Sequence, residues 1–241
     1  APVPILKELL ADDPDDSDLL EELEEVLRDI GDLESLAGVL TRRASVVRSE
    51  ERRLELLTEA ADIYDTEVGR PQAARDAWQR IRAIDESDAR AARRIEALCI
   101  ELMDVDGLLS LYSGLDRTVE AKAGGLVELG RRCIEEADDS VAAEEAFRAA
   151  LRIDARSRAA VDHLATILRS QQRWLDLIDL LRRRVEVVEQ DDPDEALSRL
   201  KTIAELQRDR VGDGHGAAST YERMMDLGAE EADAAEALIE L

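Results

Sequence analysis

Residues 138–167 read DDSVAAEEAFRAALRIDARSRAAVDHLATI, and this segment recurs along the chain. It aligns without gaps with GRPQAARDAWQRIRAIDESDARAARRIEAL from Gly69 and with GDGHGAASTYERMMDLGAEEADAAEALIEL from Gly212. One aligned column is aromatic in all three copies: Trp78, Phe147 and Tyr221. The whole chain has only six aromatic residues, so three of them in one column indicate true internal repetition. Repetition at a fixed spacing is typical of proteins built from stacked supersecondary units.

Each copy is separated from the next by about twice a period of 35 residues, which is typical of a two-helix repeat. Small or apolar residues mark the start of every second helix: Leu36, Ala74, Leu108, Ala143, Leu177 and Ala217. Between these markers apolar residues recur at every third and fourth position, which predicts amphipathic helices. We expect helices at 16–29, 33–47, 51–67, 71–84, 88–103, 105–118, 122–137, 140–153, 157–171, 174–189, 194–210 and 214–227, with shorter pieces at 3–10 and 231–241.

The composition supports an all-helical chain. The 241 residues include 57 acidic and 32 basic side chains, a net charge of −25, yet 45% are hydrophobic, which is too many for a disordered acidic tail. Proline and glycine are scarce, and alanine and leucine are strong helix formers. No apolar run approaches the roughly 20 residues of a membrane span. We expect no membrane insertion and no nucleic-acid partner, because so negative a chain repels phosphates.

The repeat columns resemble those of the tetratricopeptide repeat family, whose unit is a helix–turn–helix of about 34 residues. Small residues stand where two helices should cross in the first helix of a pair: Ala61, Gly130, Ala165 and Ala204. The second helix carries a small–large–aliphatic rhythm, as in Ala74, Trp78 and Ile81. The sequence departs from the family pattern at Glu96, which stands at a small position, and in first helices that run one residue longer. HEAT and half-a-tetratricopeptide repeats stay open as alternatives.

The resemblance implies an all-α α-solenoid of stacked antiparallel helix pairs, winding into a right-handed superhelix with the first helices on its concave face. Such an array buries a ribbon-like core between neighbouring pairs. We expect residues 1–241 to form a single solenoid with partial repeats at both ends, as a piece of a longer chain. The expected helix pairs are 16–47, 51–84, 88–118, 122–153, 157–189 and 194–227.

Basic side chains on the first helices are the candidate partner-binding residues, because the resemblance places them on the concave face. They are Arg90, Arg93, Arg94, Arg131, Arg169, Lys201 and Arg208. Such a strip could hold an acidic peptide or a free carboxylate by charge-assisted hydrogen bonds. The alternative is ordinary ion pairing with acids four residues away on the same helix. The chain has no Asn, which excludes the asparagine clamp that family members use for chaperone tails.

The charge is also uneven along the chain. Residues 1–34 hold 13 acids and two bases, and residues 213–241 hold eight acids and one base. An acidic end could attract a basic partner, with Glu21, Glu22, Glu24 and Glu25 as its centre. The alternative is a solvated helix face without a partner.

The sequence offers little for catalysis or metal binding, and we expect no enzyme activity, metal or cofactor. Cys99 and Cys133 lie on apolar stripes and are expected to be buried hydrophobes, too far apart for a disulfide. His163 and His215 lack acidic or cysteine partners at ligand spacing. The glycines of GDGHG, residues 212–216, lack the Lys-Ser/Thr of a phosphate-binding loop and predict a turn.

We therefore expect a scaffold or adaptor that binds another protein or peptide. The alternative is a regulatory or substrate-recruiting arm of a larger enzyme, such as a kinase or protease. Catalysis by the chain itself is the third and weakest hypothesis. The 29 arginines against three lysines suggest a GC-rich bacterial genome. Two unpaired cysteines suggest a cytoplasmic location. The sequence predicts neither the partner nor the oligomeric state.

Overall fold

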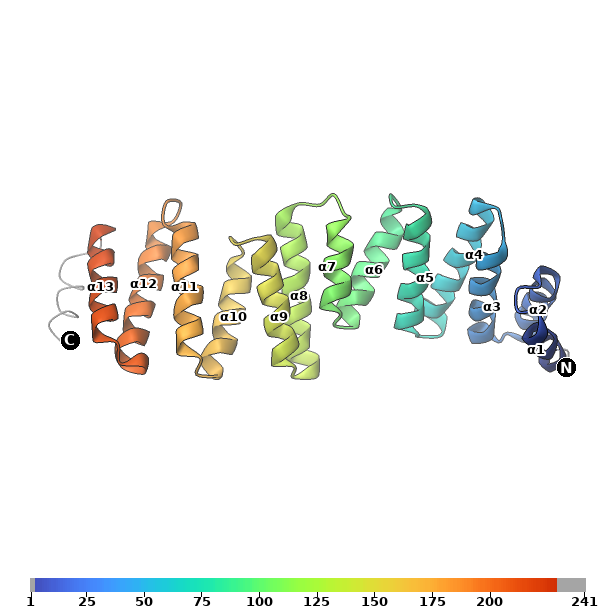
Figure 1. The fold of residues 1–241 in the computed structure, drawn as a ribbon, viewed down its shortest axis with the longest axis horizontal. Coiled ribbons are helices and arrows are strands. Elements are labelled where there is room, and N and C mark those ends of the chain that lie inside the picture. Colours follow the sequence, from blue (N-terminus) through green and yellow to red (C-terminus); the bar gives the residue numbers. More distant parts are fainter. Residues whose placement is uncertain (1–2, 229–241) are drawn as a thin grey trace. The chain divides into compact units, whose positions relative to one another are not determined.

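The computed structural model describes residues 3–228, which form helices joined by short turns and contain no β-strand (Figure 1). The chain divides into two compact units, one up to Leu115 and one from Asp116 onward. The first unit contains α1 (Val3–Asp12), α2 (Ser17–Ile30), α3 (Leu33–Val46), α4 (Glu50–Asp62), the π-helical turn η1 (Ile63–Glu67), α5 (Pro71–Ile84), α6 (Ala89–Glu101) and α7 (Val105–Ser113). The second contains α8 (Val119–Ala137), α9 (Ser140–Ile153), α10 (Arg158–Ser170), α11 (Trp174–Val188), α12 (Pro193–Leu206), η2 (Gln207–Val211) and α13 (Gly214–Asp226).

Within each unit every helix packs against the helix before it and the helix after it. This is the arrangement of stacked helix pairs, so the predicted all-α helical-repeat fold is confirmed. The first helices of the pairs are α2, α4, α6, α8, α10 and α12, and the second helices that follow them are α3, α5, α7, α9, α11 and α13. That one array runs through both units stays a prediction. The expected helix at 231–241 lies outside the described residues.

Small residues fill the helix crossings, as the repeat columns predict. Ala74, Ala143 and Ala217 are completely buried at the start of their second helices. The aromatic column follows four residues later, and its members are buried as well: Trp78, Phe147 and Tyr221. Alanine at a crossing lets two helix backbones approach closely, so one large aromatic side chain per pair suffices to fill the remaining space.

Gly130 of α8 shows how tight one crossing is. A Cβ atom at this position would lie 2.6 Å from Cε1 of the Phe147 ring, closer than non-bonded carbons can approach. The glycine therefore makes room for the aromatic side chain of the following helix. Steric exclusion by the Phe147 ring therefore explains why a small residue stands at this position of the repeat.

Glu96 breaks the small-residue column because it has a hydrogen-bonding task. Its carboxylate accepts a hydrogen bond of 2.7 Å from the hydroxyl of Tyr112 on α7, which is buried. A buried phenol needs an acceptor, so the acid replaces the small residue where the next helix supplies a tyrosine.

Many of the acidic residues between the helices are N-caps. The Asp88 side chain, for example, accepts hydrogen bonds from the backbone amides of Arg90 and Ala91 at 2.8 and 2.9 Å. Such caps satisfy amides that have no partner within the helix. The side chains that cap in this way are Asp16, Asp32, Ser49, Asp88, Asp104, Thr118, Asp139, Ser157, Asp192 and Asp213.

Two first helices absorb their additional residue as a π turn. Helix α4 continues into η1 and α12 into η2, where the backbone hydrogen bonds span five residues in place of four. Each turn is followed by a glycine with a positive φ angle, +64° at Gly69 and +75° at Gly212. The left-handed conformation at both glycines agrees with their predicted role as helix ends.

Two predicted boundaries, the end of α7 and the start of α8, were wrong. The helix expected at 105–118 ends at Ser113, and the next begins at Val119 rather than at residue 122. Gly114 follows the last turn of α7, and the Thr118 side chain caps α8 by accepting from the amide of Ala121. The apolar periodicity continued past this break, but the glycine and the capping threonine decide where the helices stop.

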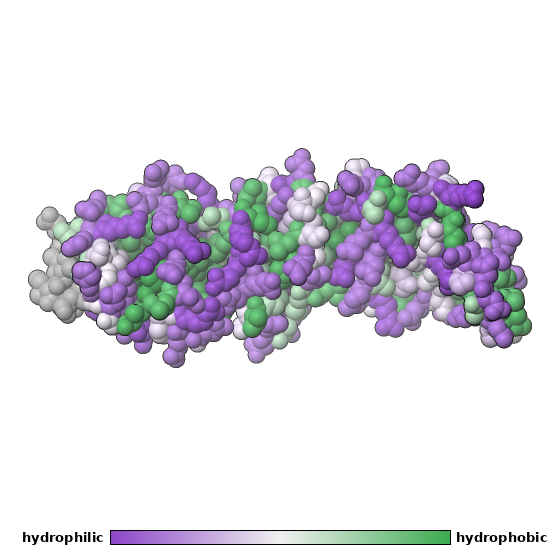
Figure 2. All heavy atoms as spheres, viewed as in Figure 1, coloured by the Kyte–Doolittle hydropathy of each residue, from purple (hydrophilic) through white to green (hydrophobic). Residues whose placement is uncertain are grey.

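Figure 2 shows that hydrophilic residues cover most of the visible face, with hydrophobic atoms exposed between them. Among the described helices, none is long and apolar enough to cross a membrane.

Candidate protein-binding site

Two of the predicted binding arginines connect helices within the first unit. Nη2 of Arg90 on α6 lies 2.6 Å from Oδ1 of Asp62 on α4, and its guanidinium carbon lies 4.9 Å from the centre of the Trp78 ring. Nε of Arg94 donates to Oδ2 of Asp65 at 2.7 Å. The Asp65 carboxylate is 7% exposed, so Arg94 neutralises an acid that is almost fully buried. Both arginines have a structural task between repeats.

Arg131 and Arg208 in the second unit also have acidic neighbours. Arg131 lies 3.0 Å from Glu135 and 3.6 Å from Glu128 on its own helix, as the alternative of i,i+4 pairing predicts. Nε of Arg208 lies 2.7 Å from Oδ1 of the adjacent Asp209. These pairs are solvent-accessible, and exposed pairs of this kind contribute only about 0–1 kcal/mol.

The other three predicted residues, Arg93, Arg169 and Lys201, are exposed. Within residues 3–228 none of them has a carboxylate partner. Arg93 and Lys201 lie three residues before the small-residue position of their helices, and Arg169 lies four residues after it. Seven residues are close to two helical turns, so each cation lies on the same side of its own first helix. Arg93 belongs to the first unit, and Arg169 and Lys201 belong to the second. We call Arg93, Arg169 and Lys201 the first-helix cations.

The acidic segment near the start of the chain is partly structural. Glu24 is buried and accepts hydrogen bonds from Arg43 on α3 and Arg28 on α2, while Glu21 lies 3.0 Å from Arg43. Burial raises the pKa of Glu24, but the hydrogen bonds from the two arginines outweigh it and hold the pKa below the usual 4.5. Glu22 and Glu25 remain exposed. A basic partner could therefore reach only part of the predicted acidic patch.

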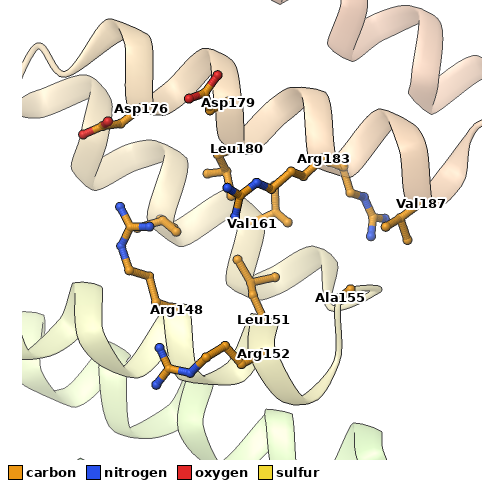
Figure 3. Close-up of a pocket in the computed structure, with 12 residues that line it drawn as sticks. Arg148, Leu151, Arg152, Ala155, Val161, Asp176, Asp179, Leu180, Arg183 and Val187 are labelled. Carbon is orange, nitrogen blue, oxygen red and sulfur yellow. The ribbon is translucent and has the colours of Figure 1, made fainter.

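A cavity of about 400 Å³ lies in the second unit between α9, α10 and α11 (Figure 3). Its apolar floor consists of Leu151, Val161, Leu164, Leu180 and Val187. We call it the α9–α11 cavity. A volume of this size lies in the range of roughly 300–1,000 Å³ that binding pockets have.

Charged side chains form the rim of the α9–α11 cavity. Arg148 and Arg152 come from α9, and Arg183 comes from α11 on the opposite side (Figure 3). Arg148 donates to Glu144 at 2.9 Å, whereas Arg152 and Arg183 have no carboxylate partner among the described residues. Asp176 and Asp179 also line the rim. They lie 2.7 Å from Arg173 and 3.8 Å from Arg182, and neither of these arginines lines the cavity.

Arg184 also lines the cavity, and its guanidinium group is fully hydrogen-bonded within the protein. Its Nε and Nη2 atoms lie 3.0 and 2.9 Å from the two carboxylate oxygens of Glu195 on α12, and Nη1 donates to the carbonyl of Arg156 at 2.7 Å. Both side chains of the ion pair are buried. The hydrogen bond from Arg184 holds the pKa of Glu195 below its usual value. This pair fixes α11 against α12 and is a structural part of the wall.

The cysteines and histidines occupy packing positions or the surface. Cys99 and Cys133 are buried free thiols, and burial raises the pKa of both, to about 11 for Cys99. A thiol with so high a pKa is mostly protonated at neutral pH and a weak nucleophile. The His163 ring stacks on Phe147 with the ring centres 5.0 Å apart. His215 is exposed in the first turn of α13, which Asp213 caps. Of the GDGHG segment, only Gly212 and Asp213 lie between the helices as predicted, and Gly214, His215 and Gly216 belong to α13.

Among residues 3–228 no group of three or more His, Cys, Asp or Glu side chains is arranged to hold a metal ion. That the chain needs no metal or cofactor, and catalyses no reaction, stays a prediction.

The α9–α11 cavity was not predicted from the sequence. Arg148 and Arg152 are spaced four residues apart on α9, which is a visible signal that both point the same way. The sequence does not show that Arg183 of α11 lies across from them, because that depends on how far apart the two second helices pack.

No family model and no curated protein matches the sequence. Solved structures that resemble it are tetratricopeptide-repeat proteins, the family that the sequence resembles. A tetratricopeptide repeat protein from Parabacteroides merdae is 16% identical, with 97% of this chain and 88% of that chain covered and a TM-score of 0.33. The C-terminal part of a TPR repeat-containing protein from Cytophaga hutchinsonii is 13% identical, with 98% and 93% covered and a TM-score of 0.35.

YrrB, described as a TPR protein with an unusual peptide-binding site, is 13% identical, with 88% of this chain and 96% of that chain covered and a TM-score of 0.31. Scores this low describe a loose likeness over the whole chain. The assignment of a helical-repeat fold rests on the chain's own helix pairs and buried columns.

Proposed function

We propose that this chain is a helical-repeat scaffold without catalytic activity that binds an acidic segment of a protein partner. The observation that carries the proposal is the position of the first-helix cations. Each of them lies in the same register on its own first helix, is exposed, and has no carboxylate partner within residues 3–228. A protein with a net charge of −25 has many acids that could neutralise them, so their unpaired state favours an external acid.

Neighbouring side chains on the same face suit a protein surface. Ile134 of α8 lies four residues after Gly130, in the register of Arg169, and is 38% exposed. Arg131 can exchange its exposed glutamate partners for a carboxylate of the partner at small cost. Apolar contacts between charged hydrogen bonds are the usual composition of a protein interface.

Affinity capture from cells of the native host tests the proposal. The wild-type chain is compared with a variant carrying Arg93→Gln, Arg169→Gln and Lys201→Gln, and captured proteins are quantified by mass spectrometry. Loss of two or three charge-assisted contacts should lower retention of an acidic partner by at least about tenfold. Raising the salt concentration should weaken capture by the wild type more than by the variant.

A matched control carries Arg70→Gln, Arg156→Gln and Arg182→Gln. These arginines are exposed and paired with Glu34, Asp191 and Asp179, so the variant has the same net charge but keeps the first-helix cations. Equal loss in both variants would show that only the overall charge matters and would contradict the proposal.

A further inference from the structure

The α9–α11 cavity combines two features that rarely meet on a strongly acidic protein. Its floor is apolar and open to solvent, and two guanidinium groups on its rim, those of Arg152 and Arg183, have no carboxylate partner within residues 3–228. Leu151, Leu180 and Val187 are only half-buried although they belong to the stripes of α9 and α11. Water in contact with such a surface is displaced favourably when an aliphatic side chain of a partner covers it.

The acidic residues of the rim and its unpaired arginines lie at different parts of the cavity. Asp176 and Asp179 lie near the beginning of α11, together with their own arginines. Arg152 in the last turn of α9 and Arg183 in the second half of α11 carry the unpaired charge. The two unpaired guanidinium groups, those of Arg152 and Arg183, thus lie on opposite sides of the apolar floor (Figure 3).

The cavity is separate from the first-helix face. Its two sides are second helices, α9 and α11, and the first helix α10 contributes only Val161 and Leu164 to the floor. None of the first-helix cations lines it. A ligand in the cavity therefore does not occupy the face described above.

We propose that the α9–α11 cavity is a second docking site, which takes an acidic amphipathic segment of a protein partner. One or two aliphatic side chains of the segment cover Leu151, Leu180 and Val187, and carboxylates on either side accept hydrogen bonds from Arg152 and Arg183. Planar guanidinium groups bind carboxylates through two parallel hydrogen bonds, which favours acidic side chains over neutral ones. The inference rests on the proposed function as a protein-binding scaffold.

Charge complementarity selects this occupant over others. A basic segment would meet Arg148, Arg152 and Arg183, and like charges at an interface are repulsive. A wholly aliphatic segment would leave the guanidinium groups without acceptors. A small free anion could bind an arginine but would leave the apolar floor exposed to water.

Titration with a labelled peptide of leucine and glutamate tests the site directly. The same peptide with glutamine in place of glutamate is its control. Fluorescence anisotropy should show saturable binding of the acidic peptide and at least about tenfold weaker binding of the glutamine peptide. A variant with Arg152→Gln and Arg183→Gln should lose at least about tenfold in affinity for the acidic peptide, with an unchanged melting temperature because both arginines are exposed and unpaired.

The matched control carries Arg158→Gln and Arg182→Gln. These residues lie on α10 and α11, pair with Asp162 and Asp179, and do not line the cavity. The control has the same net charge as the cavity variant and should bind the acidic peptide as the wild type does. Equal weakening in both variants would overturn the inference, because the peptide would then respond only to overall charge.

Methyl NMR locates the bound peptide. Shift changes should be largest at the methyl groups of Leu151, Leu180 and Val187. Shift changes confined to Ile134 and its surroundings would overturn the cavity site and leave the first-helix proposal intact.

A competition experiment separates a peptide site from a site for small anions. If free glutamate or inorganic phosphate displaced the labelled peptide as well as the unlabelled peptide does at the same concentration, the cavity would be a small-anion site and the inference would be overturned. Absence of binding to the acidic peptide would also overturn it, while host-cell capture tests the scaffold function independently.

Discussion

Arg173 at the start of α11 donates a hydrogen bond of 2.6 Å to Glu144 of α9. The same contact occurs 69 residues earlier with the charges exchanged, since Arg75 of α5 donates to Asp104 at the start of α7. Both pairs connect a second helix with the next second helix at equivalent repeat positions. The repeat thus preserves the contact between the two positions and leaves open which of them carries the acid.

Exchanging the charges of the Glu144–Arg173 pair should therefore be tolerated better than reversing one of them. Glu144→Arg places a third cation beside Arg148 and Arg173, and should lower the free energy of unfolding by about 1 kcal/mol or more. Adding Arg173→Glu should recover part of the loss. Urea unfolding of both single variants and the double variant gives the coupling energy. A coupling energy of zero would show that the conserved geometry contributes no stability.

The glycine beside Phe147 gives a steric prediction. Gly130→Ala adds a methyl group that overlaps the buried ring and should cost about 1–3 kcal/mol, against a gain in helix propensity of up to about 1 kcal/mol. Gly124→Ala in the same helix is the control, because a Cβ atom there meets nothing within 4 Å and should stabilise the protein.

The replacement Phe147→Leu supplies the second half of this test. In that background Gly130→Ala should cost much less, because the smaller side chain leaves room for the methyl group. If Gly130→Ala were as stabilising as Gly124→Ala in the wild type, thermal unfolding would refute the tight crossing.

The buried alanine column was predictable from the sequence, whereas the ion pairs between helices were not. The spacing of Ala74, Ala143 and Ala217 predicts buried crossings, because a helix repeats its faces at known intervals and the column is visible in the alignment. The ion pairs from Arg90 to Asp62 and from Arg173 to Glu144 join residues 28 and 29 positions apart. The period of a single helix predicts ion pairs between residues four positions apart. To predict an ion pair between two helices, one must also know how each helix is rotated relative to the next.

The candidate binding residues show the same division. The exposure of each first-helix cation and its register on its own helix follow from the helical period, so both were predictable, whereas a common binding face stays a prediction. That Arg90 and Arg94 are engaged with acids of α4 and η1 was not, and neither was the cavity beside Arg152. These depend on lateral distances between helices that composition and spacing leave undetermined.

The buried Arg184–Glu195 pair gives a pH prediction. The folded protein holds the pKa of Glu195 below its usual 4.5, so the ionised carboxylate stabilises the fold above that pH, and the contribution is lost as the pH falls through the folded pKa. Glu195→Gln leaves Arg184 buried beside a neutral amide and should cost about 3 kcal/mol at pH 7.

The difference between Glu195→Gln and the wild type should narrow as the pH is lowered below 4.5, since Glu195 is then protonated in the unfolded chain, and it should be smallest below the lowered pKa of the folded protein. Denaturant unfolding at a series of pH values measures it. A difference that stays constant from pH 7 into the acid range would contradict the assigned role of the ion pair.

Photo-crosslinking in the native host shows directly whether a protein partner binds the side of the first helices that carries Ile134, Arg169 and Lys201. A photoreactive amino acid replaces Ile134 on that face or, as a control, Val141 of α9, which is 74% exposed and lines neither proposed surface. We expect a covalent adduct with one protein from position 134, which is lost when Arg169 and Lys201 are changed to Gln, and no such adduct from position 141. Equal adducts from both positions, or none from position 134, would contradict it.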